Sequence, residues 1–169
     1  LIDSDRGEAS APTGRAVGRP RRAVRTAHDV LLSTRYIESS ALVAALLERD
    51  EAARASIRAQ GKRVTSALTL AETARAILRA VATGRLSEAD ARAATRGLQV
   101  FARRCDVVSV TDAVLVRVGR PFPVEPIRTL DAVHLATAEE LAEPPTLVTI
   151  VTRDARVRDN ARALGYATE

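Results

Sequence analysis

The stretch TLVTIVTRDARVRDNARALG, residues 146–165, joins the clearest buried strand of the chain to a helix that follows it directly. Its first part, 146–152, is a short apolar run, as expected for a strand that is covered on both faces. Its second part, 153–165, has helical spacing, offers Asp154 as an N-cap and ends at Gly165. A buried strand followed at once by a helix favours an α/β fold with a parallel sheet.

The same alternation continues on both sides of this stretch. Further strands are predicted at 34–38, at 62–66, at 105–110 as a buried strand, and at 166–168 as an edge strand. Helices are predicted between them, over 39–50, 51–61, 67–84, 87–104, 111–119 and 129–142. The capping residues expected for these helices are Ser39 or Ser40, Ser87, Thr111 and Thr129, with Gly61 and Gly84 as helix ends. We therefore expect a three-layer α/β/α domain whose short, mostly parallel sheet has four or five strands.

The first 33 residues differ from the rest of the chain. They contain Gly, Pro, Ser and Arg without helical or strand periodicity, so we expect a disordered or non-native N-terminal extension. Residues 34–169 are then a single domain, and a chain of this length buries roughly 70% of its unfolded surface without a disulfide or a structural metal.

Composition excludes several classes of protein. One cysteine, Cys105, permits neither an intrachain disulfide nor a thiolate zinc site, and two histidines make an imidazole-rich metal site untenable. No apolar run approaches the roughly 20 residues needed to cross a membrane. The net charge of +5 is carried by 25 arginines and one lysine. Guanidinium groups pair well with phosphate, but an arginine-biased proteome explains the excess equally well.

Four carboxylates are predicted to reach the carboxyl edge of the sheet, namely Glu38, Glu72, Asp131 and Asp154. Each also has a purely structural interpretation. Glu72 completes a capping box with Thr69, Asp131 lies in the first turn of a helix, Asp154 is an N-cap, and Glu38 is a solvated strand end. Together, however, they would repel one another unless a cation neutralised them. An oxygen-only site suits Mg²⁺ or Mn²⁺, and such a site with arginine nearby is suited to phosphodiester hydrolysis.

Four segments resemble the motifs of PIN-domain nucleases, in family order. They are YIESSALVAALL at 36–47, SALTLAETARAI at 66–77, LDAVHLATA at 130–138 and VTRDARVRDNARALG at 151–165. The resemblance covers about residues 34–169, and the simple layout is similar to that of VapC-type toxins of toxin–antitoxin pairs. It implies a PIN-like fold and a divalent-metal-dependent endoribonuclease.

The resemblance also implies roles for individual residues. Asp131 and Glu38 would be the main ligands of Mg²⁺ or Mn²⁺, and Glu72 and Asp154 would complete the acidic cluster. Ser40 and Thr152 would hold a phosphate or a metal-bound water. Candidate phosphate contacts are Arg153, Arg156, Arg75 and Arg79, each of which is equally compatible with a solvated helix face.

The implied partners are an RNA substrate and an antitoxin protein that places an arginine or lysine among the acids. A homodimer and a cytoplasmic location are expected as well.

One position departs from the family pattern, since Glu38 stands where the first acid is normally Asp. The longer side chain keeps a second hypothesis open, a non-catalytic PIN-fold module that binds RNA or protein. A response-regulator receiver is disfavoured because Glu38 stands alone after its strand. Nucleotide-cofactor enzymes are disfavoured because no glycine-rich phosphate loop is present. His134 and Cys105 are predicted to be core residues and not metal ligands.

Overall fold

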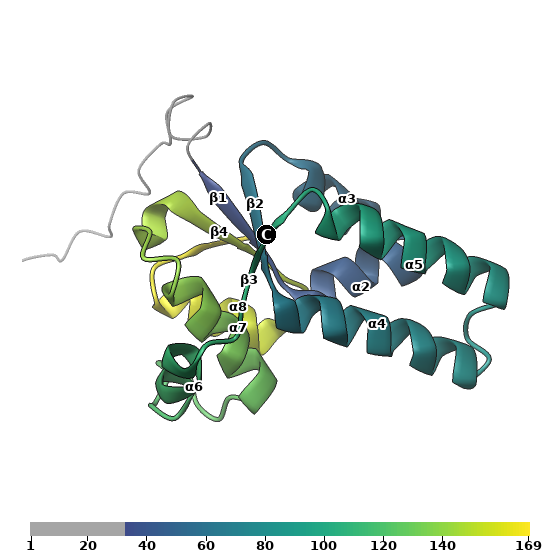
Figure 1. The fold of residues 1–169 in the computed structure, drawn as a ribbon. Coiled ribbons are helices and arrows are strands. Elements are labelled where there is room, and N and C mark those ends of the chain that lie inside the picture. Colours follow the sequence, from purple (N-terminus) through teal and green to yellow (C-terminus); the bar gives the residue numbers. More distant parts are fainter. Residues whose placement is uncertain (1–32) are drawn as a thin grey trace, which may run out of the picture.

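A computed structural model describes residues 33–169, and Figure 1 shows the fold. The expectation for residues 1–32 lies outside the described part of the chain. Ser33 lies inside it, where its side chain is buried and its carbonyl oxygen accepts a hydrogen bond of 3.0 Å from the Lys62 amide. Ser33 therefore contacts the domain predicted for residues 34–169.

The centre of the domain is a sheet of five parallel strands in the order β3-β2-β1-β4-β5. The strands are β1 (Thr34–Ile37), β2 (Lys62–Ser66), β3 (Asp106–Val108), β4 (Val148–Val151) and β5 (Ala167–Thr168). This confirms the predicted α/β class and the number of strands. The chain moves outward from β1 to β2 and β3 on one side, and later to β4 and β5 on the other. The order therefore reverses between β1 and β4, where ligands of open parallel sheets bind beyond the carboxyl ends of the strands.

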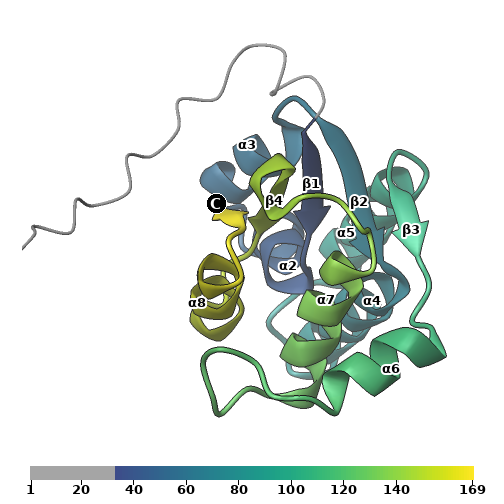
Figure 2. The same cartoon turned by 90° about the vertical axis from the view of Figure 1, so that its left-hand side faces the viewer.

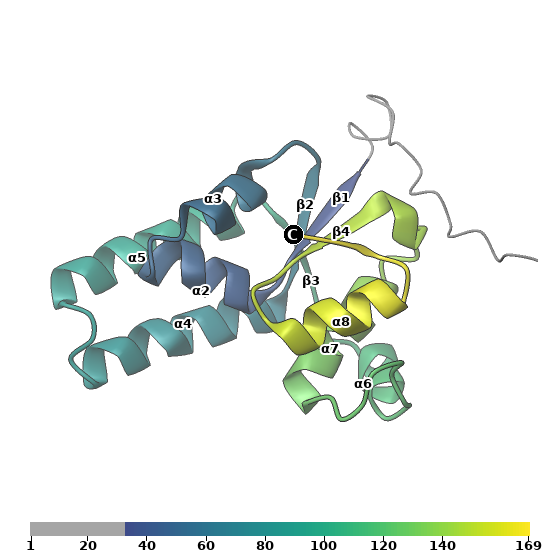
Figure 3. The same cartoon turned by 180° about the vertical axis from the view of Figure 1, so that it is seen from behind.

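Helices cover both faces of this sheet (Figures 1 and 3). One group packs on the face that carries Ile37 and Val151, and the other on the face that carries Tyr36 and Ile150. The first group is α2 (Ser39–Leu47), α3 (Glu51–Arg58), α4 (Ala67–Ala82) and α5 (Glu88–Ala102). The second is α6 (Asp112–Val118), α7 (Thr129–Glu139) and α8 (Ala155–Ala163), and a 3₁₀ turn, η1 (Pro145–Leu147), precedes β4. Figure 2 shows α7 between α6 and α8.

Alternation along the strands explains the two cores. Successive strand residues point to opposite faces, so neighbouring Tyr36 and Ile37 are both fully buried but belong to different apolar clusters. Both clusters are built mainly from aliphatic side chains and alanines, which lets the helices pack closely on a short sheet. The predicted three layers are thus confirmed.

Several local predictions were wrong. β3 is shorter than predicted and two of its three residues are exposed, because it lies at the edge of the sheet, and Cys105 before it is only partly buried. Helix α3 ends at Arg58 instead of Gly61. Gly61 has φ +127°, and a Cβ there would lie 2.5 Å from the Ser33 carbonyl oxygen, so the glycine serves a close chain contact.

The helix caps are partly as predicted. Ser87 and Thr111 cap α5 and α6. Helix α7 begins at Thr129 with Arg128 at its N-cap position and no side-chain cap. No helix among residues 33–169 is both long enough and apolar enough to span a membrane.

Candidate active site

Glu38 follows β1 and is the N-cap of α2, a role that was predicted for Ser39 or Ser40. Glu38 is almost completely buried, at 4% exposure, so its alternative interpretation as a solvated strand end was wrong. One oxygen accepts from the Ser39 hydroxyl at 2.6 Å and the Ser40 amide at 3.0 Å. The other accepts from the hydroxyls of Ser40 and Thr152, the latter at 2.8 Å. Four donors therefore hold this carboxylate in place.

Ser40 and Thr152 join the two strand ends at the switch point. Their hydroxyl oxygens lie 3.2 Å apart. The Ser40 oxygen also accepts from the amides of Arg153 and Asp154, at 2.8 and 3.1 Å, and Thr152 accepts from the Asp154 amide at 3.0 Å. Asp154 then caps α8 by accepting from the Arg156 and Val157 amides, as predicted. These bonds fix the place of Asp154 relative to Glu38.

Asp131 reaches the same place from the first turn of α7. Burial raises the pKa of its carboxyl, and the negative charges of Asp154 and Glu38 raise it further, against smaller opposing effects of Arg128 and His134. One carboxylate oxygen, Oδ2, is buried and has no hydrogen-bond partner. Asp131 is therefore close enough to the other acids to feel their charge, and one of its oxygens lacks a ligand or donor.

Glu72 comes from α4, in which Ser66 is the N-cap and accepts from the Leu68 amide. The alternative interpretation of Glu72, a capping box with Thr69, was wrong, because the Glu72 carboxylate lies 2.7 Å from His134 Nε2. Burial acts most strongly on the Glu72 pKa and raises it, but the hydrogen bond and charge of His134, with a further hydrogen bond from Ser39, lower the pKa below its ordinary value.

His134 lies in the candidate site, where sequence reasoning had predicted only a core residue. The prediction that it is buried was correct, since it is 2% exposed, but it lies among the acids, with Nε2 3.6 Å from a Glu38 oxygen. Ligand atoms of Glu38, Glu72 and His134 all lie within 4.8 Å of one another. The signal was its position three residues after Asp131, on the same face of α7.

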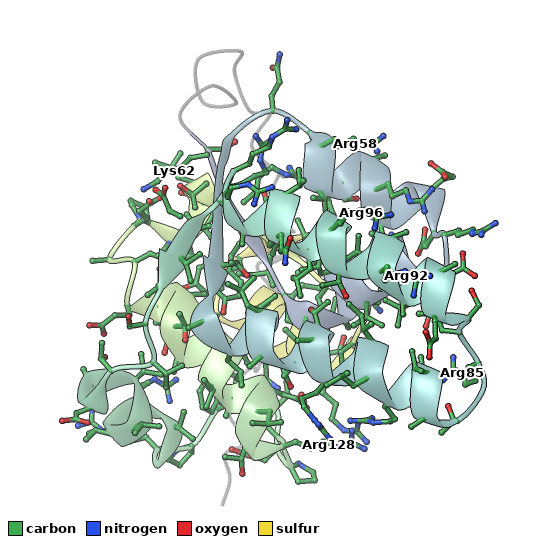
Figure 4. The ribbon with its side chains drawn as sticks, turned by 45° about the vertical axis from the view of Figure 1, so that its right-hand side comes forward. Arg58, Lys62, Arg85, Arg92, Arg96 and Arg128 are labelled. Atoms are coloured by element: carbon green, nitrogen blue, oxygen red, sulfur yellow. The ribbon has the colours of Figure 1, made fainter. Side chains whose placement is uncertain are left out.

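The predicted phosphate contacts are less uniform. The Nε of Arg153 donates to Asp50 at 2.8 Å and helps to lower the pKa of that carboxyl to about 2, so this group is committed to an ion pair with the N-cap of α3. Arg75, Arg79 and Arg156 are exposed. Arg128, which was not predicted, is exposed and its charge acts on Asp131. Figure 4 shows it away from Arg92 and Arg96 on α5.

Comparison with known proteins now identifies the fold and family. A family model described as the PIN domain matches residues 35–163. The chain belongs to the PIN domain family. This PIN domain is 38% identical over 134 residues to Ribonuclease VapC46 of Mycobacterium tuberculosis (strain ATCC 25618 / H37Rv), which covers 78% of this chain and 93% of that protein. It is 35% identical over 136 residues to Ribonuclease VapC35 of Mycobacterium tuberculosis (strain CDC 1551 / Oshkosh), with coverage of 78% and 93%.

Solved structures share the fold of this PIN domain. VapBC2 from Rickettsia felis, bound to a DNA fragment from its promoter, has a TM-score of 0.56 at 14% identity, over 80% of this chain and 97% of that one. PAE2754 from Pyrobaculum aerophilum has a TM-score of 0.51 at 21% identity, over 81% and 91%. At these identities the likeness establishes the fold and no more.

The residues present fit the divalent cation that the PIN family implies. The buried Oδ2 of Asp131 lacks a partner, and its surroundings are negatively charged. A hard cation supplies what such an oxygen lacks and favours carboxylate ligands. Glu38 has no free acceptor in the observed arrangement, but the hydroxyl groups that bind it can rotate away from it.

Proposed function

We propose that this PIN domain is an endoribonuclease that hydrolyses RNA phosphodiester bonds, and that it acts as the toxin of a toxin–antitoxin pair. The observation that carries the proposal is the meeting of Glu38, Glu72, Asp131 and Asp154 at the switch point of the sheet. We refer to these four residues as the acidic cluster. The names of the two mycobacterial relatives, both ribonucleases, support the same activity.

The side chains would divide the work as follows. Asp131 and Glu38 would hold Mg²⁺ or Mn²⁺, and Glu72 and Asp154 would complete its surroundings. When bound, the cation would lower the pKa of water and neutralise charge on the scissile phosphate. Ser40 and Thr152 keep Glu38 and the start of α8 in register. Arg128, which is exposed and acts on Asp131, would contact a phosphate of the substrate.

A cleavage assay tests this proposal. The full chain is incubated with single-stranded RNA in Mg²⁺, in Mn²⁺ and in chelator. We expect cleavage with either metal and none in chelator, leaving 5′-phosphate and 3′-hydroxyl ends. Asp131→Asn should be inactive and folded. Asp112→Asn is the matched control, because Asp112 is also a first-turn acid but is exposed on α6. Cleavage that persists in chelator would contradict the proposal.

One observation favours a second function, the non-catalytic module. Glu38 stands where the family pattern has Asp, and four donors already satisfy its carboxylate. Inactivity of the wild type with every metal, together with activity of Glu38→Asp, would favour that module over the enzyme.

The proposed partner is an antitoxin whose arginine or lysine enters the acidic cluster and replaces the charge of the cation. The homodimer and the cytoplasmic location stay predictions. Size measurement of the purified chain, alone and with its antitoxin, tests the assembly.

A further inference from the structure

A chain of hydrogen bonds leads from the core of the domain to the acidic cluster. The hydroxyl of Tyr36, which is completely buried in the middle of the sheet, lies 3.1 Å from His134 Nδ1. His134 Nε2 lies 2.7 Å from Glu72. Tyr36 and His134 thus connect strand β1 to a carboxylate on helix α4 through helix α7.

The distances place a proton on His134 Nε2. A carboxylate oxygen of Glu72 at 2.7 Å and one of Glu38 at 3.6 Å face this nitrogen, and an ionised carboxylate can only accept a hydrogen bond. Without a proton, the nitrogen lone pair would face two acceptors. With it, Nε2–H donates to Glu72 and is attracted to Glu38.

Tyr36 completes the assignment on the other side of the ring. Its hydroxyl also lies within hydrogen-bonding reach of Ser66 and Thr137. Thr137 donates its own proton to the Val133 carbonyl oxygen at 2.7 Å, so its oxygen can only accept from Tyr36. Ser66 accepts from the Leu68 amide, which leaves its proton free for the Tyr36 oxygen. With either direction of the hydrogen bond between the phenol and Nδ1, the ring is held with Nε2 toward Glu72.

We propose that Tyr36 and His134 are positioning residues, in which the buried phenol orients the imidazole ring and the ring holds the Glu72 carboxylate ready for a divalent cation. The inference rests on the proposed function, since it needs the acidic cluster to bind a cation. It also assigns His134 as a hydrogen-bond donor and not as a metal ligand, although its Nε2 lies within 4.8 Å of the ligand atoms of Glu38 and Glu72. Partners that orient metal ligands typically contribute about 10- to 100-fold to metal affinity.

Mn²⁺ binding to the full chain, followed by electron paramagnetic resonance, tests the role without any measurement of cleavage. His134→Leu removes the donor to Glu72 and should weaken Mn²⁺ binding about 10-fold or more. His134→Gln should recover most of this loss, because its side-chain amide can donate to Glu72. Tyr36→Phe should weaken binding by a smaller factor. Tyr166→Phe is the matched control, since Tyr166 is also a buried tyrosine but lies just before β5, and its variant should bind as the wild type does.

Nitrogen-15 NMR of labelled histidine shows directly whether Nε2 carries a proton, with the His134 signals assigned by their loss in His134→Gln. We expect a proton on Nε2 in the wild type. Equal Mn²⁺ affinity of wild type and His134→Leu would overturn the positioning role alone. Nitrogen coupling to bound Mn²⁺ would overturn it too, because His134 would then be a ligand. Failure of the wild type to bind Mn²⁺ would contradict the proposed function and remove the positioning role with it.

Discussion

On the β1–β4 side of the acidic cluster, Glu38 accepts hydrogen bonds from four donors, whereas on the α4–α7 side Asp131 keeps a buried oxygen without a partner. The first side is built from residues next to one another in sequence or in neighbouring strands. The second side depends on contact between two helices that are far apart in the sequence, α4 and α7. Local capping interactions satisfy the first carboxylate, and no such interactions are available to the second.

The α4–α7 side also contains two carboxyls whose pKa values are shifted in opposite directions. The pKa of Glu72 is lowered, because the effects of His134 outweigh that of burial. The pKa of Asp131 is raised by burial and by the charges of Asp154 and Glu38. His134 lies near both carboxyls and lowers the pKa of each. What differs is the direct hydrogen bond, which only Glu72 has. A cation bound at Asp131 would offset both the burial of its carboxylate and the repulsion from Asp154 and Glu38.

Asp131→Asn should have the largest effect, because it changes the acid whose oxygen lacks a partner. The amide keeps the shape of the side chain but removes the charge that would hold the cation, so we expect RNA cleavage and Mn²⁺ binding to disappear. The same variant should be at least as thermally stable as the wild type near pH 7. An acid with a raised folded pKa costs stability above that pKa, and the cost disappears as the pH falls below the unfolded value of 3.8.

Melting curves from pH 3 to pH 8 check this sign. The stability advantage of Asp131→Asn should be largest at neutral pH and vanish at low pH. Asp112→Asn, the exposed first-turn control, should show no such pattern. A variant that is less stable than wild type at neutral pH would show that the Asp131 carboxylate has a stabilising partner after all.

Glu38 variants should have the next largest effect, through activity and stability together. Glu38→Ala removes the α2 cap and leaves the donors of Ser39, Ser40 and Thr152 without their acceptor, which costs about 1–3 kcal/mol for buried groups. It should also lower the cleavage rate on the order of 10²-fold or more if Glu38 holds the cation. Chemical denaturation and cleavage assays measure the two effects separately.

Glu38→Asp sharpens the same point. The shorter side chain restores the acid usual in the family but cannot reach all four donors in the observed arrangement. We expect cleavage at a changed level, with a shifted preference between Mg²⁺ and Mn²⁺. If Glu38→Ala cleaves RNA as fast as the wild type, Glu38 is not a metal ligand.

The four acids were predictable from sequence because each belongs to a motif that a parallel sheet places at one edge. Glu38 follows a strand, Asp154 caps the helix after another, and Asp131 lies in a first helical turn. The partners of these acids were not predictable in the same way. Glu72 was predicted to join the acidic cluster, and the local spacing also allowed a capping box, but its contact with His134 spans 62 positions in sequence.

The same limit explains the errors in the fold. Strand–helix alternation predicts the parallel sheet, but it does not determine the order of its strands. The exposure of β3 depends on its position at the edge of the sheet, which the apolar letters of 105–110 do not reveal. Gly61 was predicted to end a helix because glycine is common at helix ends. In the structure it allows the backbone to pass close to the Ser33 carbonyl oxygen, where a Cβ would not fit.

Glu72→Gln should give a moderate effect of opposite sign to that of Asp131→Asn. A carboxyl with a lowered folded pKa contributes stability above its unfolded value, here 4.5, and loses it as the pH falls through the folded pKa. Glu72→Gln should therefore be less stable than wild type at neutral pH, with the difference shrinking in acid. Melting curves on the wild type, Glu72→Gln and His134→Gln measure it. A stability gain at neutral pH would contradict the pairing of Glu72 with His134.

The smallest effects are expected outside the acidic cluster, at the two arginines that flank it. The Arg153 Nε is bound to Asp50, so Arg153→Ala should cause a small loss of stability above the ordinary aspartate pKa and little change in RNA affinity. Arg128 is exposed and acts on Asp131, so Arg128→Ala should weaken RNA binding. It should also reduce the slope of log affinity against log salt by about 0.7 for each phosphate of a single strand that the protein no longer neutralises. Titration of fluorescent single-stranded RNA at several salt concentrations, in the inactive Asp131→Asn background, compares the two variants.

A larger change in slope for Arg153→Ala would mean that its guanidinium leaves Asp50 for the substrate, and the sequence-based assignment of Arg153 would then be correct.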